Sequence, residues 1–189
     1  MATARTKPAK SRLRKRLRRI LKGLASSQKK RKSQKIFLKV TALREFRTAR
    51  SVLLYASKSE EVDTYRLIER ALSLKKKVYL PRIDLRRKKL SLYRIRDLKR
   101  DLVRGPYGIL QPRLLPNRRG EEKELDLVIA PGLGFSRRGA RLGRGGGYFD
   151  RFLRKAKRAK KIGVAFREQI VKKIPVQAHD ICMDRVITD

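Results

Sequence analysis

The stretch DLVIAPGLGFSRRGARLGRGGGYFD, residues 126–150, decides the expected fold, because an apolar strand runs directly into a glycine-rich loop. DLVIA at 126–130 has the largely apolar character of a strand that is buried on both faces of a sheet. A basic helix is expected to follow the loop, from about Tyr148 to Lys161. Strand, loop and helix in this order are typical of α/β proteins, which bind ligands at the carboxyl ends of their parallel strands.

Short apolar strands alternate with helices along the rest of the chain as well. This pattern predicts an α/β fold with one domain, residues 1–189, in three layers: a mostly parallel central sheet flanked by helices. Residues 1–9 are expected to form a flexible basic N-terminus. The expected strands are 51–56, 77–82, 89–95, 126–130, 162–166 and 185–188, and the expected helices are 11–24, 27–46, 62–74 and 148–161.

The charge of the chain is strongly unbalanced. There are 54 Lys and Arg against 17 Asp and Glu, which gives a formal net charge of +37. Such a surplus raises nonspecific affinity for polyanions, so a basic nucleic-acid-associated protein that retains the fold without turnover is an alternative function. The sequence has no aromatic RNA-binding motif and no zinc pattern that would read bases. The hydrophobic content of 40% excludes a disordered chain.

Cysteine and histidine usage limits the possible sites. Cys182 is the only cysteine and His179 the only histidine, which excludes an intrachain disulfide, a cysteine-rich zinc site and a centre with several histidines. No run approaches the roughly 18 apolar residues of a membrane span. We expect a cytoplasmic monomer without a membrane segment. The basic, acid-free opening from Met1 to Lys22 leaves a transit peptide as an alternative.

The glycine loop is the strongest candidate for chemistry. Seven glycines lie between Gly132 and Gly147, where backbone N–H groups can turn toward one anion at the start of the next helix. Arg141 and Arg144 add cations to this loop. The spacing matches neither the P-loop nor the Rossmann fingerprint, so a flexible surface loop with basic flanks remains the alternative.

Asp150 follows the glycines directly and is one of few acids in a basic region. A carboxylate beside a triphosphate site is how a protein usually holds Mg²⁺, with water and phosphate oxygens completing the shell. The other interpretation is an acid at a helix start that is favoured by the helix dipole.

The segment GLGFSRRGARLGRGGGYFDRFL at 132–153 resembles the signature of the 5-formyltetrahydrofolate cyclo-ligase family. The likeness extends from about residue 8 to 189, because further family features appear in the same order. They are KSRLR at 10–14, SEEVDT at 59–64, LPR at 80–82, ILQP at 109–112 and the closing segment IGVAFREQIVKKIPVQAHDICMDRVITD at 162–189.

The resemblance implies ATP-dependent closure of 5-formyltetrahydrofolate to 5,10-methenyltetrahydrofolate, with ADP and phosphate released and Mg²⁺ required. A related α/β protein with another nucleotide or acyl substrate is a further alternative. Arg141 and Arg144 are the expected catalytic residues. By motif match, ATP is expected to contact Lys10, Arg14, Arg141, Leu142, Gly143, Arg144, Gly145, Gly146, Gly147, Tyr148 and Phe149.

The same resemblance implies positions for the metal and the folate. Asp150 and Asp180 are the expected metal ligands, while His179 is taken as a loop residue rather than a base. Glu61 matches the glutamate with which the family contacts folate. The expected folate-binding residues are Ala56, Glu61, Tyr107, Arg144 and Tyr148. For the two tyrosines, a role as ordinary aromatic residues of the core is an equal alternative.

One position departs from part of the family. Gly146 stands where some members have a lysine, so a cation directed at the phosphates is missing relative to them. Three consequences remain open: Arg144 substitutes for that lysine, the γ-phosphate is stabilised less, or the protein has diverged toward binding without turnover.

Overall fold

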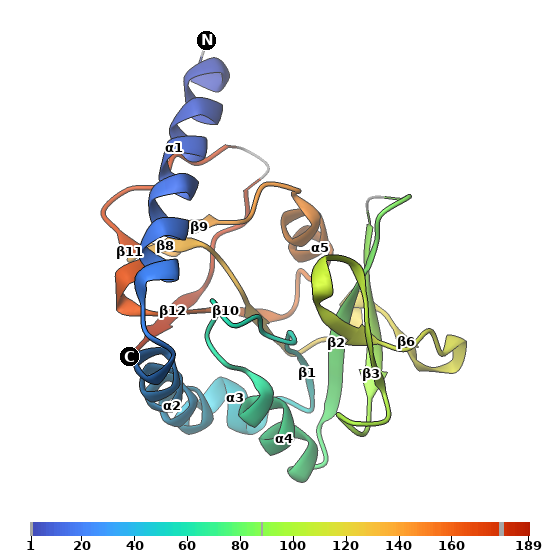
Figure 1. Ribbon diagram of the computed structural model, residues 1–189. Coiled ribbons are helices and arrows are strands. Elements are labelled where there is room, and N and C mark those ends of the chain that lie inside the picture. The colour runs from blue at the N-terminus through green and yellow to red at the C-terminus, as the bar shows by residue number, and fades with distance from the viewer. Residues whose placement is uncertain (1, 88, 178–179) are drawn as a thin grey trace.

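The computed structural model describes residues 2–87, 89–177 and 180–189. Its central element is a seven-stranded sheet of order β12-β10-β7-β1-β2-β3-β6 (Figure 1). Neighbours pair in parallel from β12 to β2, and antiparallel pairing begins only where β3 joins β2. The strands are β1 Ser51–Leu53, β2 Lys77–Asp84, β3 Lys89–Ile95, β6 Arg119–Gly120, β7 Leu127–Ala130, β10 Lys160–Ala165 and β12 Arg185–Thr188.

Helices cover both faces of this sheet, as Figure 1 shows. Val52 and Leu54 contribute to one apolar core, whereas Leu53 contributes to a second core on the other face, because successive side chains of a strand point in opposite directions. The first core includes side chains from α2 Ser26–Ala42, α3 Arg44–Thr48 and α4 Tyr65–Ser73, and the second includes those of α5 Tyr148–Lys155. The predicted α/β class, with three layers and a mostly parallel sheet, is confirmed.

The N-terminal helix is longer than expected. Helix α1 covers Ala2–Gly23, so residues 2–9, which were expected to form a flexible N-terminus, are its first turns. Alanines at positions 2, 4 and 9 favour a helix here, whereas Pro8 lies inside the helix and disfavours it, so local propensity does not account for the extension. Leu17 and Leu21 are buried on the helix, in line with the apolar stripe expected from Ser11 onward.

Helix α1 packs against a small second sheet. This sheet has the order β11-β8-β9 and consists of β8 Gly134–Ser136, β9 Arg141–Leu142 and β11 Ile170–Val171. Leu17 and Leu142 lie in the same apolar cluster, which joins the helix to the strand at the start of the glycine loop. The contact places the basic helix directly beside the loop.

Two expected helices end early. The helix expected over 27–46 is interrupted at Leu43, whose backbone is extended. In a continuous helix Val40 and Phe46 would face about 120° apart, and the interruption lets both be buried in the first core. Helix α5 ends at Lys155 rather than Lys161, because the chain from Lys160 onward pairs with β7 as β10.

The segment expected to be an irregular loop, residues 105–120, contains two strands. β5 Leu110–Pro112 pairs with β4 Leu102–Arg104, and β6 pairs with β3. The segment also contains two short 3-10 turns, Pro106–Gly108 and Pro116–Arg118. Within the described residues, no helix is long and apolar enough to cross a membrane.

Candidate active site

Two cavities meet at the glycine loop. The first, called the cationic cavity below, is lined by basic side chains from α1 and α5, by the loop backbone and by two carboxylates. The second, called the apolar cavity, lies at the carboxyl ends of β1 and β7 and reaches across to β2 and β3. Five residues line both cavities and form their shared wall: Arg141, Gly143, Gly146, Gly147 and Asp150.

The loop backbone adopts conformations that glycine makes possible. Gly145 has φ +121° and Gly147 has φ +65°, and Gly147 is also the residue that precedes the first turn of α5. A side chain at either position would be strained, whereas Gly146 does not have a positive φ. The loop therefore places the amino-terminal end of α5 at the cavities. The backbone N–H groups of a helix start can bind an anion.

Helix α1 supplies three cations to the cationic cavity, Lys7, Lys10 and Arg14, of which the sequence predicted the last two. Lys10 is buried and its Nζ bonds the Asp180 carboxylate, while Arg14 Nε donates to the Gly143 carbonyl at 2.9 Å. Burial and, after it, the neighbouring Arg18 lower the pKa of Arg14, although Asp180 and Asp150 oppose the shift. Residues four apart on a helix share a face, and Lys10 and Arg14 line the same cavity, as their spacing led us to expect.

Both expected metal ligands lie at the cationic cavity, and each is paired with a cation. Asp150 Oδ1 bonds Arg141 Nη2 at 2.7 Å, and the Arg141 side chain is only 3% exposed. Asp180 accepts from Lys10 and from the Gln177 backbone N–H. Asp150 therefore lies in the first turn of α5, where the helix dipole favours an acid, and is also tied to the loop through Arg141.

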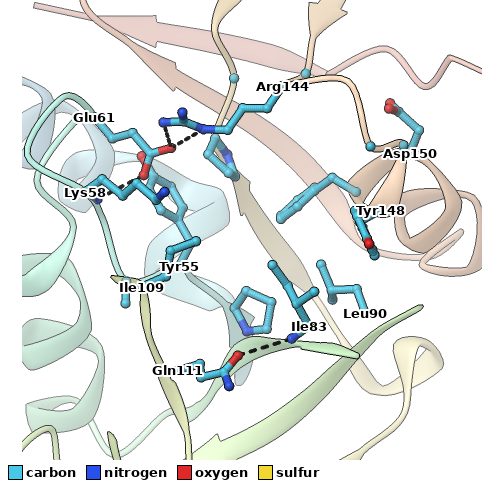
Figure 2. A pocket seen from close by; sticks show the side chains of 18 of the residues that line it. Tyr55, Lys58, Glu61, Ile83, Leu90, Ile109, Gln111, Arg144, Tyr148 and Asp150 are labelled. Atoms are coloured by element: carbon cyan, nitrogen blue, oxygen red, sulfur yellow. Dashed lines mark hydrogen bonds and ion pairs between the residues drawn. The ribbon is translucent and has the colours of Figure 1, made fainter. Parts of the chain in front are cut away.

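The apolar cavity is enclosed by residues that follow or end separate strands. Tyr55 and Ala56 come after β1, Ile83 belongs to β2 and Leu90 to β3, with Tyr148 of α5 on the opposite wall from Tyr55 (Figure 2). Its volume of about 180 Å³ is below the roughly 300 Å³ at which ordinary ligand pockets begin, which suits one ring system rather than a whole extended ligand. Burial raises the pKa of the Tyr55 hydroxyl, which donates to the Val62 carbonyl.

Glu61 and Arg144 meet at the mouth of the apolar cavity. Arg144 Nε and Nη2 lie 3.2 and 2.8 Å from Glu61 Oε1, and Figure 2 shows the arginine reaching across to the glutamate. Burial alone would lower the pKa of Arg144, but Glu61 and Glu60 more than offset it and raise that pKa. Arg144 lines the apolar cavity and not the cationic one, so it lies apart from the other expected phosphate ligands.

The other expected site residues divide between the cavities. Leu142 and Gly145 line the cationic cavity, whereas Ala56, Tyr148 and Phe149 line the apolar one. Tyr107 belongs to the turn Pro106–Gly108, and its side chain lies outside the described part of the chain, as does His179.

Several lining residues were missed by sequence reasoning. Arg151 and Arg154 of α5 line the cationic cavity. The position of Arg154, four residues after Asp150 on the same helix, could have indicated it. Tyr55, Ile83 and Leu90 line the apolar cavity but look like ordinary strand residues, so no local signal separates them from the core.

The fold and the site geometry together define a class: an α/β protein with a glycine loop suited to anions at the carboxyl ends of its strands. The chain belongs to the 5-formyltetrahydrofolate cyclo-ligase family, whose model matches residues 6–189, and that family consists of ATP-dependent ligases.

Individual relatives agree with this assignment. The chain is 32% identical to a Caenorhabditis elegans protein named probable 5-formyltetrahydrofolate cyclo-ligase, over 96% of this chain and 93% of that one. It is 29% identical to the mouse 5-formyltetrahydrofolate cyclo-ligase, over 99% and 97% of the two chains. The solved structure of Aquifex aeolicus 5,10-methenyltetrahydrofolate synthetase superposes with a TM-score of 0.82 at 33% identity, covering 94% of this chain and 88% of that one. These comparisons give no support to the nucleic-acid-associated alternative.

Proposed function

We propose that this protein uses ATP to close 5-formyltetrahydrofolate to 5,10-methenyltetrahydrofolate, with release of ADP and phosphate. The observation that carries the proposal is the shared wall of the two cavities. A triphosphate in the cationic cavity and a pterin ring in the apolar cavity would face one another across Arg141, Gly143 and Gly146. Family membership supplies the identity of the two substrates.

The reaction needs little from the protein beyond position and charge. The formyl oxygen attacks the γ-phosphorus of ATP, and the bond from phosphorus to the ADP oxygen breaks. N10 then adds to the formyl carbon, the carbon–oxygen bond breaks, phosphate leaves and the N10 proton passes to solvent or phosphate. Phosphoryl transfers of this kind depend on alignment and on neutralising the equatorial oxygens, which is what a basic loop at a helix start provides.

The roles of the individual residues follow from their places in the cavities. Lys10, Arg14 and Arg141 neutralise the triphosphate, and the backbone from Gly143 to Gly147 donates N–H groups to it. Glu61 accepts hydrogen bonds from the pterin N–H donors, and Tyr148 packs against the ring. Arg141 Nε is buried without an acceptor in the described part of the protein, so this catalytic arginine retains one unused donor.

The carboxylates fit a magnesium ion that enters with the nucleotide. Among the described residues no group of three or more acidic, histidine or cysteine side chains could enclose a metal alone. Mg²⁺ usually keeps several waters and takes one or two carboxylates plus phosphate oxygens, so Asp150 and Asp180 are sufficient. Bound there, the ion would neutralise charge on the phosphates. The same two carboxylates hold Arg141 and Lys10 beside the phosphates.

The proposal is tested by turnover. With MgATP and 5-formyltetrahydrofolate, near-ultraviolet absorbance of the methenyl product should grow in proportion to the protein, and omission of ATP should abolish it. The substitution Glu69→Ala is a suitable control, because the exposed side chain of Glu69 on α4 lines neither cavity. A high concentration of folded protein that forms no ATP-dependent product overturns the proposed activity.

A second proposed property, with less support than the enzymatic activity, is nonspecific binding of polyanions through α1. Five cations lie on the solvent side of this helix within an arc of about 120°, opposite the buried Leu17. They are Arg12, Lys15, Arg16, Arg19 and Lys22. If they contact phosphates, changing all five to Gln should reduce the slope of log K against log salt for a DNA duplex by up to about 4 to 5. An unchanged slope assigns the binding to distributed surface charge instead.

We also propose that the protein acts as a cytoplasmic monomer. Both cavities are built from one chain, and Cys182 is exposed as a free thiol, which suits a reducing compartment. Light scattering at working concentration tests the monomer: a mass near 22.0 kDa supports it and a multiple contradicts it.

A further inference from the structure

Arg144 is held by two adjacent carboxylates that differ in their surroundings. Its Nε and Nη2 donate to Glu61 Oε1, while its Nη1 donates to Glu60 Oε1 at 3.0 Å. Glu61 lines the apolar cavity and its side chain is 15% exposed, whereas Glu60 lines neither cavity and is 43% exposed. One carboxylate is therefore available to a ligand in the cavity, and the other is not.

Arg144 and a bound pterin compete for the same acceptor. Glu61 Oε2 already accepts from the Lys58 backbone N–H at 3.0 Å, which fixes the carboxylate. Arg144 places two N–H groups on Glu61 Oε1, so a pterin whose donors bond both oxygens of this carboxylate must take Oε1 from Arg144. When a ligand takes Glu61, Arg144 loses two of its three bonds to the pair of glutamates, and the bond to Glu60 is the one that survives.

The position of Arg144 in the loop explains why the reaction depends on holding its side chain in place. The arginine belongs to the loop that forms the shared wall, between Gly143 and Gly145, and its own carbonyl accepts from Arg18 Nη2 at 3.2 Å. A flexible side chain released here would turn to solvent or to the carboxylates of the cationic cavity. Held by Glu60, its guanidinium stays at the mouth of the apolar cavity, beside the place where the formyl group meets the γ-phosphate.

We propose that Glu60 is a positioning residue, which keeps Arg144 at the reacting centre after the folate has taken Glu61. The inference rests on the proposed function for the identity of the ligand. It assigns a specific role to an acid that touches no ligand, and it predicts that Glu60 matters more for turnover than for substrate binding.

The first test is a double-mutant cycle in steady-state kinetics with Glu60→Ala, Arg144→Ala and the double variant. Because Arg144 is partly exposed, Glu60→Ala should lower kcat by roughly two- to fivefold while KM for ATP stays unchanged. Glu60→Gln retains an acceptor oxygen and should recover part of the loss. In the Arg144→Ala background, Glu60→Ala should have no further effect. Glu69→Ala, at an exposed glutamate outside both cavities, should match wild type.

The second test does not depend on turnover. The slowly exchanging Nη–H signal of the Arg144 guanidinium, which reports a bond to either carboxylate and is identified by its loss in Arg144→Ala, should persist on addition of 5-formyltetrahydrofolate in the wild type. In Glu60→Ala it should persist without the folate and broaden or exchange away with it. Wild-type kcat in Glu60→Ala, a loss that remains in the Arg144→Ala background, or a signal indifferent to Glu60 each overturn the positioning role. Absence of product from wild type, with the signal behaving as expected, contradicts the proposed activity alone.

Discussion

The two cavities are built in opposite ways. The cationic cavity is polar and is lined largely by two helices, the glycine loop and the segment around Asp180, whereas the apolar cavity is assembled from strand ends far apart in the sequence. In the cationic cavity each acid is already paired with a cation, as in Asp150 with Arg141 and Asp180 with Lys10. At the mouth of the apolar cavity Arg144 is bonded to Glu61, the carboxylate proposed to bind the pterin.

Because of this difference, substitutions in the two cavities should affect different steps of the proposed reaction. A ligand in the cationic cavity adds to an existing network of charges, so changes there should act on phosphoryl transfer. In the proposed complex the pterin bonds Glu61 in place of Arg144, so changes in the apolar cavity should act on folate affinity. Single substitutions in each cavity can therefore show whether the division is real.

The largest effect is expected at the cationic cavity. Asp150→Ala removes a candidate Mg²⁺ ligand and leaves the buried Arg141 without its carboxylate. The loss of several kcal/mol of transition-state stabilisation should lower kcat by about two powers of ten or more. Steady-state rates across a Mg²⁺ titration measure it, with circular dichroism to verify folding. Asp150→Asn keeps an acceptor for Arg141 and separates the loss of metal from the loss of the ion pair.

An Asp150→Ala protein with wild-type turnover and wild-type Mg²⁺ dependence would reduce this acid to a partner of Arg141. The cationic cavity would then bind phosphate through cations and backbone alone, and the proposed metal site would move to Asp180.

The next effect is expected at the apolar cavity. Glu61→Gln keeps the shape of the side chain and one acceptor oxygen but loses the charge that both Arg144 and the pterin donors use. A charge-assisted hydrogen bond contributes about 1.5 to 3 kcal/mol, so kcat/KM for 5-formyltetrahydrofolate should fall roughly 10- to 100-fold. KM for ATP should change little. A loss of equal size for both substrates means that the two cavities do not act separately.

Sequence reasoning was most successful where the signal is local. The apolar runs at Ser51–Leu53 and Leu127–Ala130 predicted buried parallel strands, and the spacing of Lys10 and Arg14 predicted two cations on one helix face. The motif order correctly indicated the family. These features depend on neighbours within a few residues, which a pattern can report.

It was least successful where distant contacts decide. The break at Leu43 follows from the burial of Val40 and Phe46 in one core, and the pairing of β4 with β5 converts an expected loop into sheet. The position of Arg144 depends on Glu60 and Glu61, more than 80 residues away along the chain. No periodicity in the glycine loop could have shown that Arg144 points toward the apolar cavity.

Gly146 offers a way to change both cavities at once, because it lines the shared wall. Its backbone accepts a side chain, but an added Cβ would lie 2.7 Å from the Tyr148 ring, which would have to move. Gly146→Lys should raise kcat/KM for ATP by about tenfold at most, since a contact of 1.5 to 3 kcal/mol is set against that displacement. KM for the folate should rise, because Tyr148 lines its cavity.

The position of Arg144 changes the expected outcome of a second cycle. Since this arginine lies at the apolar cavity, Gly146→Lys should fail to rescue Arg144→Ala in steady-state kinetics at fixed salt. Gly146→Ala is the matched control, which adds the Cβ without the charge. Rescue of Arg144→Ala by the new lysine would show that Arg144 serves the phosphates after all.

The smallest effect is expected at the opposite edge of the sheet, where Asp126 tests stability without touching either cavity. Its Oδ2 accepts from the backbone N–H groups of Arg50 and Ser51 at 2.8 and 2.9 Å, which ties the start of β1 to the start of β7. Although burial opposes it, these hydrogen bonds hold the pKa of Asp126 below its ordinary value.

A carboxylate whose pKa is depressed by folding stabilises the protein above its unfolded pKa of about 3.9, and that contribution is lost as the pH falls through the folded pKa. Asp126→Asn should therefore lower the free energy of unfolding by roughly 1 kcal/mol at pH 7, with the difference from wild type shrinking below about pH 4. Denaturant titrations across this range at fixed salt measure it. Glu69→Gln is the control, because it makes the same change in net charge at an exposed site and reports any added repulsion in this basic chain.

Turnover of Asp126→Asn should equal that of wild type, because the residue lies at the amino ends of the strands and both cavities meet at the carboxyl ends. A fall in kcat without a fall in stability would mean that the two edges of the sheet are coupled, and the assignment of chemistry to the carboxyl edge alone would be wrong.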